Sequence, residues 1–155
     1  MDYIRYKQQV MQEVERRGLT SVMNDTRWEK LKVGVYRKLP FPPAFQVKKV
    51  LSPKAEPESF QQDVSYDGDW HTILGDESDD AQFCDWQHPA CDVEWIRVKP
   101  RRLEFRGRLV ENKLIDIEAA FVTLLKECGI PYMYKEGDYW IYGYATAAEF
   151  AHLHK

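Results

Sequence analysis

Residues 130–144 read Ile-Pro-Tyr-Met-Tyr-Lys-Glu-Gly-Asp-Tyr-Trp-Ile-Tyr-Gly-Tyr, and they carry the clearest signal for the fold class. Its two runs of aromatic and apolar residues, 130–134 and 139–144, are typical of strands. Between them lie polar residues and Gly137, which suits a tight turn. The sequence therefore predicts a β-hairpin and, with it, an antiparallel sheet.

A helix is predicted directly before this hairpin, over residues 116–127. Its apolar stripe consists of Ile117, Phe121, Leu124 and Leu125. Asp116 is a suitable N-cap, and Gly129 is a suitable residue at the C-terminal stop. An amphipathic helix next to a hairpin favours a helix packed on one face of the sheet.

The remaining elements follow from apolar spacing and from the position of proline. We expect a helix over 2–18, a second helix that starts with a Thr26/Glu29 capping box and ends before Pro40, strands over 44–51, 70–74, 93–98 and 103–106, and a short helix over 146–154. The predicted fold is α+β in the order α-α-β-β-β-α-β-β-(α). It has a mostly antiparallel sheet of about five strands and helices packed on one face, in a single domain over 1–155.

Length and composition exclude several classes of protein. The chain has 155 residues, 44% of them apolar and 14% aromatic, which is enough to build a core. No run approaches the 18 apolar residues of a membrane span, and residues 1–7 contain no apolar leader, so we expect a cytoplasmic protein. Three cysteines are an odd number, which argues against a disulfide framework.

Charge is strongly segregated along the chain. The net charge is −3, but residues 56–94 hold 12 acidic residues and no Lys or Arg. We call residues 56–94 the acidic segment. Its densest part is Asp76-Glu77-Ser78-Asp79-Asp80. One interpretation is a solvated loop that is neutralised inside the protein, because charge runs usually lie on solvated faces.

The other interpretation is a docking surface for a basic protein, with aromatic anchors among the carboxylates. The expected partner-binding residues are Asp69, Trp70, Asp76, Glu77, Asp79, Asp80, Asp85 and Trp86. We expect no cofactor, no catalytic residue and no membrane partner. Binding of nucleic acid by the basic run from Arg97 to Arg108 is a less favoured alternative, because the acidic residues dominate.

One cluster resembles a metal site or a cysteine-based active site. Cys84, His88 and Cys91 lie within eight residues, and His71 is a possible fourth zinc ligand. The spacing is not that of a standard zinc finger, and no signature of a cysteine hydrolase surrounds these residues. A zinc-binding or cysteine-based enzyme is therefore the alternative to a binding protein.

Several short segments resemble a family of small bacterial cytosolic domains that have no assigned enzymatic activity. They are residues 19–28, Leu39-Pro40-Phe41-Pro42-Pro43, residues 93–100, Leu114-Ile115-Asp116, Gly129-Ile130-Pro131-Tyr132 and Ile141-Tyr142-Gly143-Tyr144. The resemblance covers about residues 19–145, between the N-terminal helix 2–18 and the C-terminal helix 146–154. These motifs are structural, so the resemblance implies a fold and transfers no catalytic residue.

In size, charge and class the chain is also similar to bacterial immunity proteins. These proteins neutralise a toxin domain, which is often a basic nuclease. This similarity implies a non-enzymatic protein that binds a basic toxin encoded nearby, and it agrees with the charge of the acidic segment.

Overall fold

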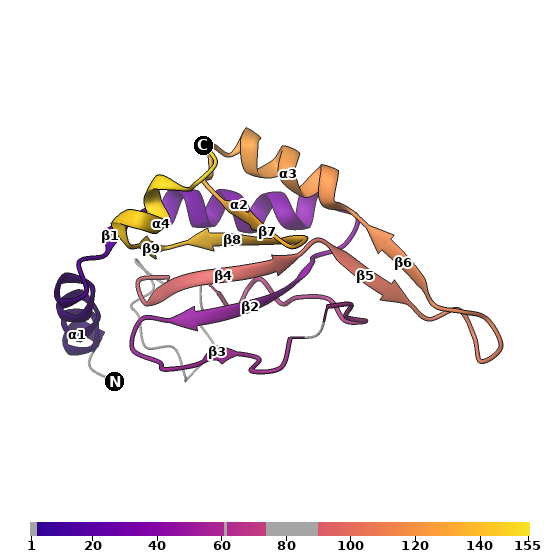
Figure 1. Ribbon diagram of the computed structural model, residues 1–155, viewed down its shortest axis with the longest axis horizontal. Helices are drawn as coiled ribbons and strands as arrows, with labels where there is room; N and C mark the ends of the chain where they lie inside the picture. The colour runs from indigo at the N-terminus through magenta and orange to yellow at the C-terminus, as the bar shows by residue number, and fades with distance from the viewer. Residues whose placement is uncertain (1–2, 61, 74–89) are drawn as a thin grey trace.

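The computed structural model describes residues 3–60, 62–73 and 90–155 (Figure 1). The elements are α1 (Tyr3–Arg16), β1 (Thr20–Ser21), α2 (Asp25–Lys38), β2 (Ala44–Lys49), β3 (Ala55–Glu56), β4 (Val93–Lys99), β5 (Arg101–Glu104), β6 (Lys113–Asp116), α3 (Glu118–Glu127), β7 (Met133–Lys135), β8 (Asp138–Tyr142), β9 (Tyr144–Ala145) and α4 (Ala147–Ala151). All strand pairs between these elements are antiparallel, which confirms the predicted α+β class.

The main sheet has five strands in the order β3-β2-β4-β8-β7. Strand β4 is central, because Ile96 pairs with Val47 of β2 on one side and with Ile141 of β8 on the other. The predicted hairpin is β7–β8. Its two-residue turn places Glu136 and Gly137 at φ 53° and 86°, as in turns that match the twist of a hairpin.

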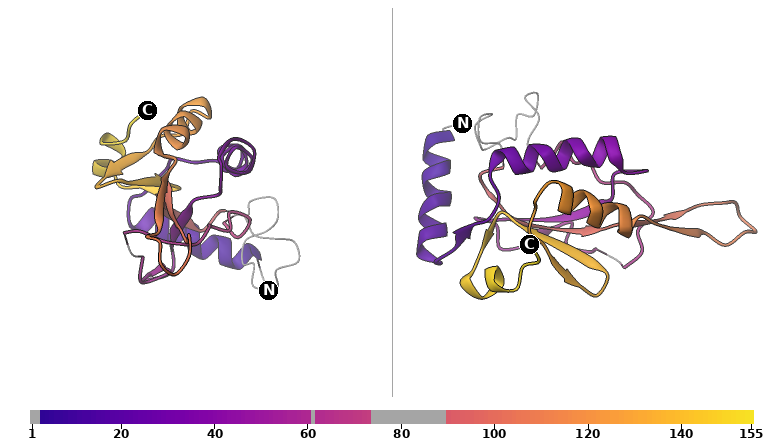
Figure 2. Two further views of the ribbon diagram at one scale, coloured as in Figure 1. Left: turned by 90° about the vertical axis from the view of Figure 1, so that its right-hand side faces the viewer. Right: turned by 90° about the horizontal axis from the view of Figure 1, so that it is seen from above.

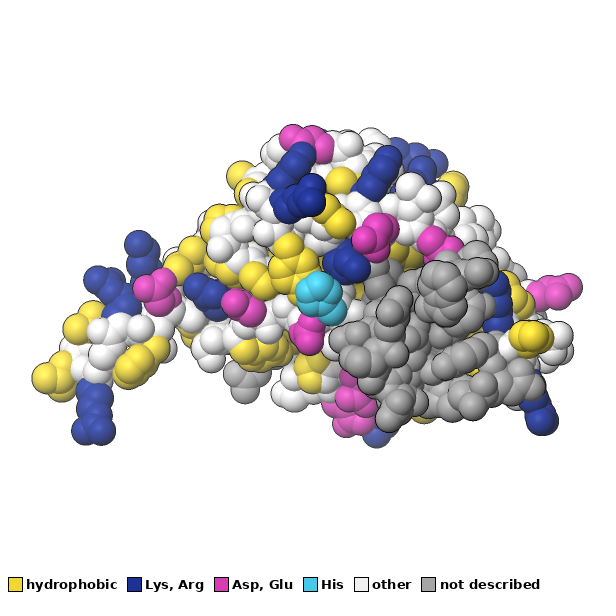
Figure 3. Space-filling model, turned by 180° about the vertical axis from the view of Figure 1, so that it is seen from behind, with side chains coloured by type: hydrophobic (Ala, Val, Ile, Leu, Met, Phe, Trp, Pro, Cys, Tyr) yellow, Lys and Arg dark blue, Asp and Glu magenta, His cyan; other side chains and the backbone are white. Residues whose placement is uncertain are grey.

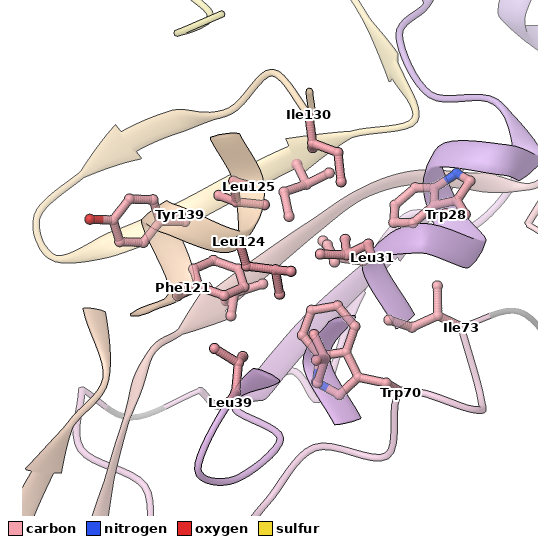
Figure 4. Packing of buried hydrophobic residues seen from close by; sticks show 14 of the residues in the cluster. Trp28, Leu31, Leu39, Trp70, Ile73, Phe121, Leu124, Leu125, Ile130 and Tyr139 are labelled. Carbon is pink, nitrogen blue, oxygen red and sulfur yellow. The ribbon is translucent and has the colours of Figure 1, made fainter. Parts of the chain in front are cut away.

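Helices α2 and α3 cover one face of this sheet (Figure 2). Alternate residues of the central strands, Ile96 and Val98 of β4 and Tyr139 and Ile141 of β8, belong to the core cluster beneath them. Figure 4 shows side chains of α2, α3 and the segment around Trp70 meeting in this cluster. The period of two along a strand explains the pattern, since every second side chain faces the helices.

The opposite face of the sheet, which we call the open face, has two different halves. A second, smaller cluster of Val22, Tyr142, Ala145 and Leu153 is buried at one end of the sheet. Trp95 and Trp140 pack against it from the central strands. Farther along β4, Arg97 and Lys99 share a face because they are two residues apart.

Two helix starts differ from the sequence prediction. Helix α2 begins after Asn24, whose side-chain oxygen accepts the Arg27 N–H at 2.8 Å, so the N-cap is Asn24 and not Thr26. Asn at this position satisfies the free N–H groups of the first turn as well as Thr would. Helix α3 begins at Glu118, so its N-cap is Ile117 and not Asp116, but the Asp116 carboxylate still accepts the Glu118 N–H at 2.7 Å.

Several short elements also differ. The strand predicted at 70–74 is a turn where it is described, because Asp69 accepts the N–H and the hydroxyl hydrogen of Thr72 with its carbonyl oxygen. Strands β1, β3, β6 and β9, which are two to four residues long, were not predicted. Helix α4 is shorter than the predicted 146–154 and starts with a capping box of Thr146 and Glu149. None of the helices in the described residues is both long and apolar enough to cross a bilayer.

Candidate functional site

Most of the expected partner-binding residues lie outside the described residues. These are Asp76, Glu77, Asp79, Asp80, Asp85 and Trp86, together with Cys84 and His88 of the alternative metal site. Asp69 and Trp70 are described. Asp69 is exposed, and its carboxylate accepts the His71 N–H at 3.2 Å.

Trp70 is a core residue, so its assignment as a surface anchor is wrong. Its side chain is 1% exposed, and its indole Nε1–H donates to the Pro43 carbonyl oxygen at 2.8 Å. The ring meets Phe45 edge-on, with centroids 5.2 Å apart. An aromatic residue between acidic residues looks like a surface residue in the sequence, but the turn at Asp69 directs this one inward.

The end of the acidic segment is neutralised inside the fold. Asp92 accepts hydrogen bonds from Tyr6 at 2.8 Å and from Lys49 at 3.0 Å. Burial and the neighbouring Asp92 carboxylate raise the pKa of Tyr6. Glu94 is bound by Arg17 and Lys48. Burial alone would raise the pKa of the Glu94 carboxyl, but the hydrogen bonds from Arg17 and Lys48 outweigh burial and lower it.

Other carboxylates of the acidic segment face solvent. Glu56, Asp63 and Asp69 are exposed and form no ion pair with another described residue. Asp67 is bound by Arg102 at 2.6 Å. The described part of the segment thus holds both internally paired and solvent-facing carboxylates, so each sequence interpretation accounts for some of them.

The alternative metal site loses one of its ligands. Cys91 is disulfide-bonded, so its sulfur is not a thiolate ligand for zinc, and the expectation from the odd cysteine count is wrong here. The exposed His71 ring stacks on Tyr36 with centroids 4.7 Å apart. Within residues 3–60, 62–73 and 90–155, no three His, Cys, Asp or Glu side chains are arranged to hold a metal ion. Disulfides are rare in the cytosol, so this bond weighs against the expected location, which stays a prediction.

The most prominent surface feature was predicted only in part, as a strand over 103–106 that overlaps β5. Strands β5 and β6 form a two-stranded ribbon with residues 105–112 at its tip, and Figures 1 and 2 show it extending beyond the sheet. We call residues 101–116 the arm. Exposed large apolar side chains gather on it, namely Phe105 (72%), Leu109 (100%), Val110 (50%) and Leu114 (44%). The space-filling view shows hydrophobic and basic side chains together on this limb (Figure 3).

The base of the arm is fixed to the body by consecutive arginines. Arg101 donates to the Gly137 carbonyl oxygen through both Nη1 and Nη2, at 2.9 and 2.8 Å. The turn needs glycine at position 137 for its positive φ, and a Cβ there would also lie 2.7 Å from Arg101 Nη2. Arg102 binds Asp67 and lies over the Phe41 ring, 4.2 Å from its centroid.

A cluster of opposite charges occupies the open face beside the arm. The Asp138 carboxylate is contacted by Arg97 Nε at 2.6 Å, by Lys99 Nζ at 3.0 Å and by Arg101 Nη2 at 3.0 Å. Lys99 and Asp138 are almost completely buried. We call Arg97, Lys99, Arg101 and Asp138 the charge cluster. The alternation of Trp95, Arg97 and Lys99 along β4 was the only local signal for it, because Asp138 lies about 40 residues away in sequence.

Comparison with known proteins gives a family and no closer match. No curated protein and no solved structure matches the chain significantly. A family profile described as a family of unknown function matches residues 10–148, from within α1 to within α4. This match includes the sheet, the arm and the charge cluster, and it agrees with the resemblance to uncharacterised bacterial domains. The chain belongs to the family of unknown function DUF6678.

Proposed function

We propose that the chain is a non-enzymatic protein-binding module that docks its partner through the tip of the arm. The observation that carries this proposal is the set of exposed apolar side chains on the arm, among them Leu109, which is fully exposed. Scattered apolar residues are normal on a surface, whereas several of them on one projecting ribbon mark an interaction site.

The arm suits docking better than it suits stabilising the fold. Strands β5 and β6 pair with each other and are not part of the main sheet. Phe105, Leu109 and Val110 therefore contribute little burial to the isolated protein, and their burial would accompany binding. Buried aromatic and aliphatic anchors commonly supply most of the affinity of an interface.

We further propose that the partner is a basic domain, such as a toxin that this chain neutralises as an immunity protein. The charge of the acidic segment supports this class, because a negative surface speeds the capture of a positive protein. The exposed, unpaired carboxylates of Glu56, Asp63 and Asp69 contribute to that field. The arm carries both signs of charge, with Arg106 and Arg108 as well as Glu104 and Glu111. It provides the apolar anchor that the buried Trp70 cannot provide.

Co-expression with the product of the adjacent gene, followed by titration calorimetry of the purified pair, tests this function. We expect a one-to-one complex. Leu109→Glu should weaken it by about 100-fold or more, because a charge would enter an apolar interface. The matched control is Ile4→Glu on α1, which is equally apolar and 73% exposed but lies away from the arm. Equal affinity of wild type and Leu109→Glu would exclude the arm as the docking element.

The proposed charge of the partner needs a separate measurement. Reversing Asp79 and Asp80 to Lys should slow association and weaken its salt dependence, since exposed charges act mainly on the association rate. An unchanged association rate at low salt would exclude these carboxylates from steering. That result would leave the arm as the docking element.

A further inference from the structure

We propose that the open face carries a binding pocket for a phosphate monoester, in addition to the docking function of the arm. A cavity of about 300 Å³ lies beside the charge cluster. It is lined by Gln62, Arg97, Lys99, Lys135, Glu136, Asp138 and Trp140. Its volume is at the lower end of the range typical of small-molecule sites.

The pocket has more positive than negative charge. Asp138 is the shared partner of Arg97, Lys99 and Arg101, so one carboxylate faces three cations. Lys135 adds a fourth cation, whose side chain makes no ion pair or hydrogen bond with another described residue, and Glu136 adds a second carboxylate. The residues that line the cavity carry an excess of one positive charge, and Arg101, which contacts Asp138 from outside the lining, raises the excess to two. Like charges repel strongly beside such partly buried groups.

Aromatic rings hold the cations in place. The Arg97 guanidinium lies 5.1 Å from the Trp140 ring and 5.6 Å from the Phe60 ring, and Lys99 Nζ lies 4.7 Å from the Phe60 ring. These contacts and the bonds to Asp138 restrict both side chains before any ligand arrives. Preorganised cations lose little entropy on binding, so the excess charge is well placed for an anion.

The amount of charge selects the class of ligand. A phosphate monoester carries a charge of about −1.5 to −2 at neutral pH, which matches the excess of two positive charges. Its oxygens accept hydrogen bonds from guanidinium and ammonium groups, and the Gln62 amide offers a further donor. The indole of Trp140 provides an apolar wall for the organic part of such a ligand.

Titration with inorganic phosphate and with adenosine monophosphate at constant ionic strength, followed by ³¹P NMR or calorimetry, tests the pocket. We expect a dissociation constant of about 1 mM or tighter for at least one of them. Equal affinities for phosphate and adenosine monophosphate would show that the pocket recognises the phosphoryl group alone. Tighter binding of the nucleotide would show that the Trp140 ring also contributes to the affinity. Binding of neither would overturn the proposal.

Substitutions separate a specific site from general attraction. Lys135→Gln removes an unpaired cation from the pocket and should weaken binding about tenfold, the effect of one charge-assisted hydrogen bond. Lys126→Gln on α3 is the matched control, because this lysine is also exposed, has no ion-pair partner in the described part of the chain and does not line the cavity. If both variants lost the same affinity for phosphate, the effect would come from general surface charge, and the proposal would be overturned.

A third variant distinguishes binding from a purely structural charge cluster. Asp138→Asn keeps the shape of the side chain but leaves three cations without their carboxylate. We expect a lower melting temperature in chloride and about tenfold tighter binding of phosphate, since the anion would replace the lost charge. Phosphate should raise the melting temperature of Asp138→Asn more than that of wild type. An equal or smaller increase would contradict the site.

Discussion

Arg17 and Glu94 form a two-point ion pair between residues 77 positions apart in the chain. Nη1 of Arg17 lies 2.7 Å from Oε1 of Glu94, and Nη2 lies 2.9 Å from Oε2. The pair joins the residue after α1 to the central strand β4, and Lys48 of β2 contacts the same carboxylate at 3.1 Å. This relationship holds α1 against the sheet at a position where Glu94 is mostly buried.

Removal of this carboxylate should destabilise the protein above pH 5. Glu94→Gln leaves Arg17 and Lys48 with a neutral partner, and we expect a loss of about 2 kcal/mol in the free energy of unfolding at pH 7, the usual contribution of a hydrogen bond to a charged group. The pKa of Glu94 is lowered in the folded state, so its contribution is present above the ordinary value of 4.5 and is lost as the pH falls through the folded pKa. Urea denaturation from pH 3 to pH 7 measures it, and the curves of variant and wild type should converge at the acid end.

A neighbouring arginine provides the control for this prediction. Arg16 forms an exposed ion pair with Glu13 one turn earlier in the same helix. Arg16→Ala should leave the melting temperature unchanged, because exposed pairs contribute little. A larger loss in Arg16→Ala than in Arg17→Ala would contradict the role of the Arg17–Glu94 pair.

The packing of α2 on α3 should depend on the absence of a side chain at Gly34. A Cβ built there would lie 2.3 Å from Cδ1 of Leu124, which is itself buried. Gly34→Ala should therefore cost about 1–2 kcal/mol, although alanine favours a helix by about 1 kcal/mol over glycine. Denaturant midpoints would measure this difference.

A second substitution tests the steric reason. In a Leu124→Ala background the clash disappears, so Gly34→Ala should become neutral or stabilising there. This double-mutant cycle isolates the contact between the two positions. The same loss in both backgrounds would place the effect of Gly34 elsewhere.

Trp70 should behave as a core residue in mutagenesis. Trp70→Ala is expected to destabilise the fold by about 3–5 kcal/mol, the range for large core deletions. Trp70→Phe keeps most of the packing with Phe45 but loses the hydrogen bond to the Pro43 carbonyl oxygen. This loss should lower the free energy of unfolding by about 1–3 kcal/mol. Thermal unfolding followed by near-UV circular dichroism measures both, and a fully stable Trp70→Ala protein would contradict this burial.

The tip of the arm should be dispensable for stability. Glu104 and Lys113 are direct partners across the ribbon, so a two-residue Asn-Gly turn can replace residues 105–112 and join them. We expect the melting temperature to change by less than about 3 °C, because this tip buries little apolar surface. Calorimetry checks this expectation. The shortened protein should no longer bind its partner. A large drop in melting temperature would show that the tip supports the fold.

The sequence predicted those elements whose apolar pattern repeats over several residues. Strand β4, the β7–β8 hairpin and helix α3 each bury an apolar face in the core. The spacing of apolar residues in the sequence therefore matches the residues that are buried. The arm gave a weaker signal, a predicted strand over 103–106 where β5 lies, because a ribbon that projects from the body has little reason to alternate apolar with polar residues. Short strands such as β1 and β9 depend on partners more than 100 residues away.

Candidate site residues were harder to predict for a related reason. Trp70 and the acidic residues around it were read from local composition, whereas the direction of each side chain depends on the turn at Asp69. The charge cluster assembles Lys99 and Asp138 from strands that meet only in the folded sheet. Without that pairing, neither residue differs from an ordinary charged residue of a strand.

The order of strands in the sheet has a consequence for synthesis on the ribosome. Strand β4 is central, and it pairs with β2 through contacts such as Ile96 with Val47 and with β8 through Ile96 with Ile141. The partners lie 49 and 45 residues away, so loops must close before the sheet gains its main contacts, which slows folding. A nascent chain that ends before β8 exposes one edge of β4, and aggregation of such intermediates should decrease only when residues 138–142 have emerged.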